Sequence, residues 1–373
     1  MKITMIGPVY PYRGGIAHYT TTLSKKLMAA GHTVQTISFK RQYPAWLYPG
    51  ESDKDPSTLH EQVPALYTLD PLYFWTWGRA ARQIQAFQPD LVIIQWWTTF
   101  WAPAYGVLAR WLKRLGLRVV VLIHNVMPHE TRFWDRWLCR FALSPADQYI
   151  AQAEREASRL HTLLPGAKIT VTPLPVYNML AGGALSPVEA RAKLGLPADD
   201  PIVLFFGIVR PYKGLRYLLQ AFQILKGKGN HAQLLVAGEF WEPIGEYQQM
   251  IERLGIADRV HITNRYIPNE EIPIFFSAAD LFAAPYVDGT QSASAKLALG
   301  FGLPMVLTRC IVDQTLAAQE NTWLAVERNA GSLATAILAA LEQGQEHRLA
   351  GKPSRVGEAL DDWHQIVQVI EKL

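Results

Sequence analysis

Cysteine is scarce in this sequence: only Cys139 and Cys310 occur among 373 residues. The two lie far apart in the chain and show neither the pattern of a disulfide scaffold nor the spacing of metal ligands. The cysteine content therefore gives no indication of an oxidising compartment, where small domains depend on disulfides. We expect a cytoplasmic protein.

Long uninterrupted apolar runs are also absent. The longest apolar region, residues 91–123, is broken by Pro103 and by the basic residues Arg110, Lys113 and Arg114. It therefore does not predict a membrane-spanning helix. The first residues, MKITMIG, show no charged segment followed by a long apolar run and a cleavage site. We expect no export signal and no transmembrane segment.

Metal-ligand patterns are missing as well. His124 and His129 form H-x-x-x-x-H, which lacks the internal glutamate and the spacing of a zinc helix. The Asp-x-Asp of Asp53 and Asp55 stands in a polar loop and not after a strand-like run. The sequence predicts no metal site.

Apolar strand-like segments, in contrast, are abundant, and 49% of the residues are hydrophobic. Continuous apolar runs alternate with segments of helical period in two series. Such runs are typical of strands covered on both faces, and hence of parallel α/β sheets. The sequence therefore predicts two doubly wound, Rossmann-like domains. The runs are residues 2–6, 33–39, 90–95 and 118–124, then 202–207, 233–238, 259–263, 280–286 and 304–308.

The boundary between the two domains is expected in residues 172–187, which are rich in proline and glycine and interrupt both periods. We place an N-terminal domain at residues 1–175 and a C-terminal domain at residues 176–356. Residues 357–373 are expected to form an amphipathic helix that joins the first domain. Its apolar positions at helical spacing are Leu360, Trp363, Ile366 and Ile370.

The charges are divided unevenly along the chain. Residues 1–180 contain 19 lysines and arginines against 11 acidic residues, a net charge of +8, whereas the remainder contains 17 against 21, a net charge of −4. A basic half suits nucleic acid, anionic lipid or a phosphorylated ligand, and charge alone does not distinguish these partners.

Two loops of the first series carry candidate site residues. In GPVYPYRGGIAHYT, residues 7–20, Gly14 and Gly15 remove side chains where the backbone can approach a ligand, and a helix N-terminus that attracts anions follows. This suits a phosphate, although a plain turn using glycine for its dihedral freedom explains it equally well. His124 follows a buried run, where it can donate to a bound hydroxyl, stabilise charge or be structural.

The second series has a similar turn after residues 202–207. Arg210 and Lys213 lie three residues apart there. A guanidinium fork and an ammonium can together clamp a diphosphate, because both project into one crevice beyond the strand end. A solvated pair of loop charges is the alternative.

A further turn follows residues 280–286. Thr290 can cap a helix whose first amides, near Gln291 and Ser292, are available to a phosphate oxygen. Asp288 is a candidate for binding sugar hydroxyls, or an ordinary turn residue before a glycine.

Three segments together make the sequence resemble the nucleotide-sugar-dependent glycosyltransferases of family 4. They are the G-x5-K-G motif from Gly207 to Gly214, the segment PNEEIPIFFSAADLFAAP at residues 268–285, and GLPMVLT at residues 302–308. The resemblance covers nearly the whole chain. It implies the GT-B fold, in which two Rossmann-like doubly wound domains face each other across a cleft.

The resemblance also implies a reaction: transfer of a hexose from a nucleoside diphosphate sugar to a saccharide or lipid-linked acceptor, with retention at the anomeric carbon. It implies that Arg210 and Lys213 hold the diphosphate and that His124 lies near the transferred sugar. Expected donor contacts are Gly14, Gly15, Gly207, Asp288, Thr290, Gln291 and Ser292, and expected acceptor-side contacts are Arg13 and His18. Because the nucleotide sugar is a substrate, we expect no cofactor, no required metal and no nucleic acid partner.

The sequence departs from the family pattern in two places. Ile208 stands where the family's arginine often follows the strand-end glycine, so Arg210 has to serve from two residues later. Gly289 and Leu297 replace the family's Glu-x7-Glu pair, although members with a Gln-Ser pair in this loop are similar.

Two other functions stay open: a catalytically silent nucleotide-sugar-binding partner protein, and a sugar-nucleotide epimerase of the same fold, which would need paired acidic groups.

The acceptor is suggested by the aromatic residues. Nine of the twelve tryptophans precede residue 140, in the basic half. Residues 130–143 predict a helix with aromatic side chains near one face and Arg132, Arg136 and Arg140 around it. Such a helix suits a membrane interface, whereas a buried aromatic helix is the alternative. We therefore expect peripheral docking of the first domain on an anionic inner membrane surface, with Arg110, Lys113 and Arg114 beside the acceptor groove.

Overall fold

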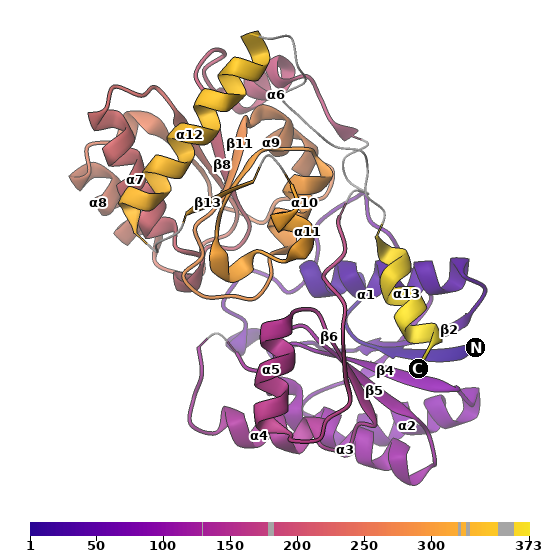
Figure 1. Cartoon of the computed structure of the whole chain (residues 1–373). Coiled ribbons are helices and arrows are strands. Elements are labelled where there is room, and N and C mark those ends of the chain that lie inside the picture. Colours follow the sequence, from indigo (N-terminus) through magenta and orange to yellow (C-terminus); the bar gives the residue numbers. More distant parts are fainter. Residues whose placement is uncertain (129, 178–182, 320–321, 326–328, 350–361) are drawn as a thin grey trace. The chain divides into compact units, whose positions relative to one another are not determined.

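The protein is described by a computed structural model covering residues 1–128, 130–177, 183–319, 322–325, 329–349 and 362–373 (Figure 1). These residues form two compact units. The first contains residues 1–56, 60–174 and 362–373, and the second contains residues 57–59 and the described part of 175–361. The boundary after Leu174 lies one residue before the predicted one. Residues 357–361 of the predicted terminal helix fall outside the described residues.

One short segment, residues 57–59, departs from the predicted division because it belongs to the second unit. The carboxylate of Glu270 accepts hydrogen bonds from Thr58 N (3.0 Å), Thr58 Oγ1 (2.9 Å) and Leu59 N (3.4 Å). The backbone N–H of Asn269 donates to Ser57 Oγ. These long-range bonds attach the segment to the second unit, and the local sequence does not reveal them.

The first unit is built on a parallel seven-stranded sheet in the order β3-β2-β1-β4-β5-β6-β7. The strands are β1 Lys2–Ile6, β2 Thr33–Phe39, β3 Ala65–Leu69, β4 Leu91–Trp96, β5 Val119–Ile123, β6 Gln148–Ala151 and β7 Ile169–Val171. β4 and β5 are buried along their whole length because helices cover both faces of the sheet. β3 and β7 are the edge strands and are partly exposed.

Helices cover the two faces of this sheet in separate groups. On one face, α1 (Gly15–Ala29) and α13 (Trp363–Glu371) lie side by side, with the Tyr19 and Trp363 rings 5.1 Å apart (Figure 1). The other face carries α2 (Phe74–Phe87), α3 (Ala102–Arg114), α4 (Asp135–Leu143) and α5 (Glu154–Leu163). Right-handed crossovers require this separation because the strand order reverses at β1.

The second unit contains a parallel six-stranded sheet in the order β10-β9-β8-β11-β12-β13. The strands are β8 Ile202–Phe206, β9 Gln233–Ala237, β10 Val260–Thr263, β11 Leu281–Ala284, β12 Met305–Thr308 and β13 Thr322–Ala325. The helices are α6 Pro187–Leu194, α7 Leu215–Gly227, α8 Ile244–Arg253, α9 Ile272–Ala278, α10 Ala293–Gly300, α11 Gln314–Ala317 and α12 Ala330–Leu349. α12 packs along α7 (Figure 1). None of the described helices combines the length and apolar character needed to cross a bilayer.

The strand order reverses once in each sheet, between β1 and β4 and between β8 and β11. In open parallel sheets, ligands bind beyond the carboxyl ends of the strands at such a reversal. The loops after β8 and β11 are therefore neighbours, and these loops carry Arg210 and Thr290. The loop after β1, with Gly14, occupies the corresponding place in the first sheet.

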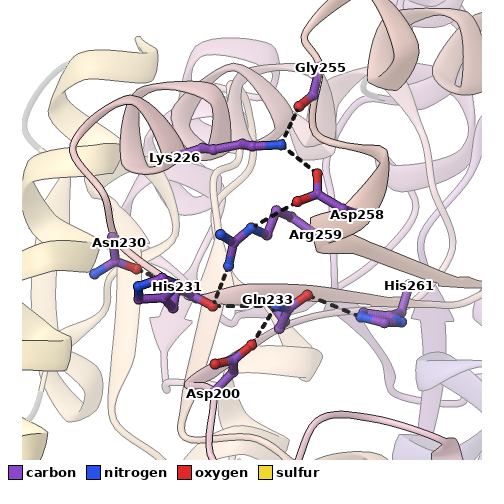
Figure 2. A network of polar contacts seen from close by, with 10 residues as sticks. Asp200, Lys226, Asn230, His231, Gln233, Gly255, Asp258, Arg259 and His261 are labelled. Carbon is purple, nitrogen blue, oxygen red and sulfur yellow. Dashed lines mark hydrogen bonds and ion pairs between the residues drawn. The ribbon is translucent and has the colours of Figure 1, made fainter.

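The opposite, amino-terminal edge of the second sheet carries a polar network (Figure 2). Gln233 at the start of β9 donates through Nε2 to Asp200 Oδ2 (2.7 Å) and accepts from His261 Nε2 (3.2 Å). Lys226 donates through Nζ to Asp258 Oδ1 (2.6 Å). Lys226, at the amino-terminal edge, thus has a carboxylate partner within the protein. It serves as a comparison for Lys213, which lies at the carboxyl-terminal edge of the same sheet.

Candidate functional site

Lys213 and Gly207 lie together at the reversal point of the second sheet. Gly207 follows β8 with a φ of 108°, and a 3₁₀ turn, Pro211–Lys213, precedes α7. A Cβ built on Gly207 would stand 2.9 Å from Lys213 Nζ and 3.2 Å from Ser294 Oγ. The absence of a side chain at Gly207 therefore leaves the space in which the ammonium lies.

Gly214, the last residue of the G-x5-K-G motif, marks a second close approach. Its φ is 72°, and a Cβ there would stand 2.0 Å from the carbonyl oxygen of Pro285. The backbone N–H of Val287 donates to the carbonyl of Tyr212 (2.8 Å). The loops after β8 and β11 thus pack directly on each other, and both glycines have a steric reason to be present.

Lys213 is only 9% exposed, and the charge of Arg210 acts on it. Burial lowers the pKa of Lys213, Tyr212 opposes that shift, and the positive charge of Arg210 adds to it. Within the described part of the chain, no carboxylate pairs with Lys213 Nζ. A buried ammonium is unfavourable unless an anion accompanies it. This place therefore suits an anionic ligand.

The loop after β11 ends at a helix cap that differs from the predicted one. α10 begins at Ala293, and its N-cap is Ser292, whose Oγ accepts from Ala295 N (3.1 Å). The prediction that Thr290 caps this helix is wrong, because the backbone at Ser292 is still extended (φ −139°, ψ 112°). The helix thus begins two residues later than expected.

The shift leaves the Thr290 hydroxyl buried. Thr290 is 6% exposed, and its Oγ1 has no hydrogen-bond partner among the described residues. Buried hydroxyls are nearly always hydrogen bonded, so this oxygen indicates a place for a ligand or solvent group. Asp288 and Gln291 flank Thr290 in the loop and are partly exposed. Asp288, Thr290 and Gln291 remain predicted contacts of the sugar-donor substrate. Thr290 would make its contact through the unpaired hydroxyl and not as a helix cap.

Sequence reasoning missed two residues of this site, Tyr286 and Ser294. Lys213 Nζ lies 5.5 Å from the ring centroid of Tyr286, and the Tyr286 hydroxyl accepts from Ser292 Oγ (3.2 Å). Burial raises the pKa of Tyr286, while hydrogen bonds with Ser292 and Ser294 oppose that shift. Tyr286 follows a strand, and Ser294 lies in the first turn of a helix. These positions in the sequence are the signals that could have identified both residues. We call Gly207, Lys213, Tyr286, Ser292 and Ser294 the lysine cluster.

Arg210 is held between aromatic rings. Its guanidinium carbon lies 5.5 Å from the ring centroid of Tyr212 and 5.5 Å from that of Trp241. The side chain is partly exposed. Because its charge contributes to the lowered pKa of Lys213, the two cations share one electrostatic environment.

In the first unit, Gly14 is the N-cap of α1, with a φ of 100° that favours glycine. A Cβ there would meet no atom within 4 Å, so backbone conformation and not crowding within the protein explains this glycine. α1 begins at Gly15 without a side-chain cap and without an acidic residue in its first turn. Such a helix start can receive an anion.

The two predicted acceptor-side residues flank this helix start. Arg13 donates through Nε to the hydroxyl of Tyr48 (3.0 Å) and lies over its ring. His18 Nε2 lies 3.6 Å from Asp55 Oδ2. Burial lowers the pKa of His18, and Asp55 opposes that shift. Loop residues after β2 thus restrain both side chains.

His124 lies directly after β5 and is 3% exposed. Its Nε2 donates to Gln95 Oε1 (2.7 Å), and its ring meets Tyr19 edge-on at 4.9 Å. Burial lowers the pKa of His124 to about 3, and a hydrogen bond with Gln152 opposes the shift. His124 is therefore uncharged near neutral pH, which excludes a role as a fixed cation.

The predicted site residues thus fall into two groups. Gly207, Lys213 and Ser292 come together in the second unit with Arg210 beside them, whereas Arg13, Gly14, Gly15, His18 and His124 belong to the first. Across the part of the chain that the structure describes, which omits His129, no group of three or more His, Cys, Asp or Glu could hold a metal ion.

Two Rossmann-like parallel sheets, with a buried ammonium or an uncapped helix start in the loops at their reversal points, define a two-domain α/β protein of the GT-B fold. The family model described as Glycosyltransferase Family 4 matches residues 13–177, and the model described as Glycosyl transferases group 1 matches residues 200–343. Between them they cover most of the chain. This protein belongs to the family 4 glycosyltransferases.

Curated relatives agree with this assignment. The chain is 29% identical over 217 residues to D-inositol 3-phosphate glycosyltransferase 2 of Catenulispora acidiphila, a match covering 55% of this chain and 50% of the relative. It is 31% identical over 170 residues to 2-deoxystreptamine glucosyltransferase of Streptomyces kanamyceticus, covering 44% and 43%. The matches thus span about half the length of these relatives.

Solved structures share the fold over the whole chain. Sucrose-phosphate synthase from Thermosynechococcus elongatus superposes with a TM-score of 0.72 at 21% identity, covering 100% of this chain and 97% of the other. HepE from Anabaena, in complex with UDP and glucose, superposes with a TM-score of 0.73 at 17% identity, covering 100% of both chains.

Proposed function

We propose that this protein transfers a hexose from a nucleoside diphosphate sugar to a saccharide or lipid-linked acceptor with retention of configuration. The observation that carries the proposal is the buried ammonium of Lys213, which has no carboxylate partner within the described chain. A leaving diphosphate develops negative charge, and a prearranged cation stabilises that charge in the transition state. Arg210 and the N-terminus of α10 add positive potential within the same unit, and the proposed mechanism uses these groups in place of a metal.

The nature of the donor is supported by the related proteins. HepE is described in complex with UDP-glucose, and one curated relative is a glucosyltransferase. A uridine diphosphate hexose is therefore the first donor to test. The lysine cluster would contact its diphosphate, with Thr290 Oγ1 as an additional hydrogen-bonding group.

His124 would act on the first-domain side as a neutral group. Because Gln95 and Gln152 hold a ring that is uncharged near neutral pH, it would orient the transferred sugar by hydrogen bonding without carrying charge. Arg13 and His18, beside the start of α1, would contact the acceptor.

The lipid-linked alternative for the acceptor is supported by the surface at the start of α4. Phe133 is 90% exposed, Trp137 67% and Trp134 41%, and Arg132 lies over the Trp134 ring. Exposed aromatic residues among cations suit the interface of an anionic membrane. We therefore propose that this surface docks peripherally on the inner face of the membrane, beside a membrane-bound acceptor.

The residues of the basic cluster at the end of α3 differ in their relation to this docking surface. Lys113 pairs with Asp147, which also accepts from the backbone N–H of Val119 at the start of β5. Arg110 donates to the carbonyls of Gly106 and Phe141. The placement of this cluster beside the acceptor groove stays a proposal: Lys113 lies at the amino-terminal edge of the sheet, whereas Arg110 lies 4.2 Å from the centroid of the Phe141 ring, which stacks on Trp137.

The test is turnover of UDP-glucose and other common nucleotide sugars by the purified protein, with saccharide and lipid acceptors. Lys213→Ala should lower turnover by about 10² to 10³, by analogy with loss of an oxyanion donor. Lys226→Ala is the matched control, because it removes the same charge at the opposite edge of the same sheet (Figure 2). Equal turnover in both variants would refute the site. Donor binding without turnover would favour the silent partner protein, and rearrangement without an acceptor would favour the epimerase.

A further inference from the structure

The ladder between β8 and β9 extends beyond the strands themselves. Val209 N donates to the carbonyl of Glu239 (2.9 Å), and Trp241 N donates to the carbonyl of Val209 (3.1 Å). The glycines before this extension permit it, because a Cβ at Gly238 would stand 2.1 Å from the carbonyl oxygen of Gly207. The extension places Arg210 and Trp241 beside each other at the carboxyl edge of the sheet.

The side chains then fix one another. The guanidinium of Arg210 lies 5.5 Å from the ring centroids of both Trp241 and Tyr212. The indole Nε1 of Trp241 donates to Glu239 Oε2 (2.9 Å), and Glu239 is 7% exposed. On the other side, the Tyr212 ring meets Tyr286 edge-on at 5.8 Å. Each ring that contacts the guanidinium is thus held by a second residue.

We propose that Trp241, fixed by Glu239, is a positioning residue that holds the guanidinium of Arg210 toward the leaving diphosphate. An arginine side chain has several rotatable bonds, and freezing it before the donor arrives removes an ordering cost from the reaction. Contact with two aromatic faces supplies that restraint by cation–π attraction. The proposal rests on the proposed function, because it assigns Arg210 to the donor diphosphate.

The proposal also accounts for the altered spacing of this loop. Arg210 stands three residues after the strand-end glycine, Gly207. The position directly after that glycine is occupied by Ile208. In this position Arg210 follows the bridge between Val209 and Phe240. The Trp241 ring is then available on one side and the Tyr212 ring on the other. We infer that the displaced arginine depends on these rings for its orientation.

A double-mutant cycle tests the proposal. Arg210→Ala, Trp241→Ala and the double variant are compared for kcat and KM in UDP-glucose turnover, and for UDP affinity by calorimetry. Trp241→Ala is expected to lower kcat about tenfold. The double variant is expected to be no slower than Arg210→Ala alone, because residues acting through one contact are not additive. Trp241→Phe keeps an aromatic face but loses the Nε1–H that Glu239 holds, so its kcat should fall between those of the parent and Trp241→Ala, whereas Glu239→Gln keeps an acceptor for that N–H and should stay near the parent.

Independent, additive effects of the two substitutions would overturn the proposal, as would unchanged kcat and UDP affinity in Trp241→Ala. Normal turnover in Arg210→Ala while Lys213→Ala is inactive would overturn it and leave the proposed function standing. If the parent protein transfers no sugar, the proposed function fails, and the same cycle in UDP affinity still decides whether Trp241 acts through Arg210. Melting temperatures identify any variant whose loss comes from unfolding.

Discussion

The ammonium of Lys213 occupies the space that a side chain at Gly207 would need, since a Cβ there would stand 2.9 Å from Lys213 Nζ. The glycine at the end of β8 therefore determines where the principal cation of the proposed donor site lies. The two residues are six positions apart in sequence. They belong to one motif because the lysine ammonium fills the space that a side chain at the glycine would occupy.

Gly207→Ala should therefore displace Lys213 and weaken UDP binding about tenfold, the effect expected when a charged contact is lost. It should also lower stability by about 1–2 kcal/mol, because alanine is strained at a φ of 108°. Gly229→Ala is the matched control, with a φ of 74° and no atom within 4 Å of the added Cβ. Calorimetric titration should show normal UDP affinity in Gly229→Ala, and a comparable loss in both variants would contradict the shared-volume argument.

Acid should destabilise the protein through His124. Its pKa is lowered to about 3 in the folded protein, whereas the unfolded chain titrates near its ordinary value of about 6.5. Between these values the unfolded state binds one more proton, so the free energy of unfolding rises with pH and falls as the solution is acidified. The slope contributed by one such proton is about 1.4 kcal/mol per pH unit.

His124→Gln should remove this contribution. Urea unfolding at pH 7, 6 and 5 should show a shallower loss of stability in the variant than in the parent. Identical slopes would mean that His124 is not buried in its neutral form.

Breaking the ion pair between Lys296 and Asp313 by removing one partner should lower stability strongly, whereas replacing both partners should not. Lys296 is fully buried in α10, and its Nζ lies 2.8 Å from Asp313 Oδ2. Lys296→Met leaves a largely buried carboxylate and should cost about 3–5 kcal/mol in urea unfolding. The double variant Lys296→Met/Asp313→Asn should recover most of that loss, because asparagine can still cap α11 at Leu316 N. Purely additive losses would show that the two groups are not coupled.

Membrane docking should depend on the start of α4. Arg132→Glu/Arg136→Glu should reduce sedimentation with anionic liposomes by on the order of tenfold or more, because each basic residue near such a surface contributes about 1 kcal/mol. Added salt should have the same effect on the parent protein. The charge-matched control is Arg114→Glu/Arg118→Glu, which alters exposed residues at the opposite edge of the sheet.

Hydrolysis of the donor should stay nearly unchanged in both charge-reversal variants. If the parent protein does not bind anionic liposomes at low salt, the docking surface is refuted and a saccharide in solution becomes the first acceptor to test. An equal loss in the control would show that only the overall charge matters.

The central strands were predictable because burial on both faces produces a continuous run of apolar residues. Each of the nine apolar runs is a strand, with ends within two residues of those predicted. β3, β6, β7 and β13 were missed. Three of them are edge strands, whose exposed faces admit polar residues, and β6 has only four residues. Short or half-exposed strands carry too few apolar positions to stand out from loops.

The sequence by itself determined that two doubly wound sheets would form and that the glycine-containing loops at their strand ends carry the candidate site, because apolar runs and strand-end glycines are local signals. Only the tertiary structure decided which side chains meet. It moved the helix cap from Thr290 to Ser292, placed Tyr286 and Ser294 beside Lys213, and brought Trp241 to Arg210 through the pairing of β8 with β9. It also showed that the two ends of α3 lie at opposite edges of a sheet. These relations depend on strand order and helix direction, and no local pattern of residues encodes either.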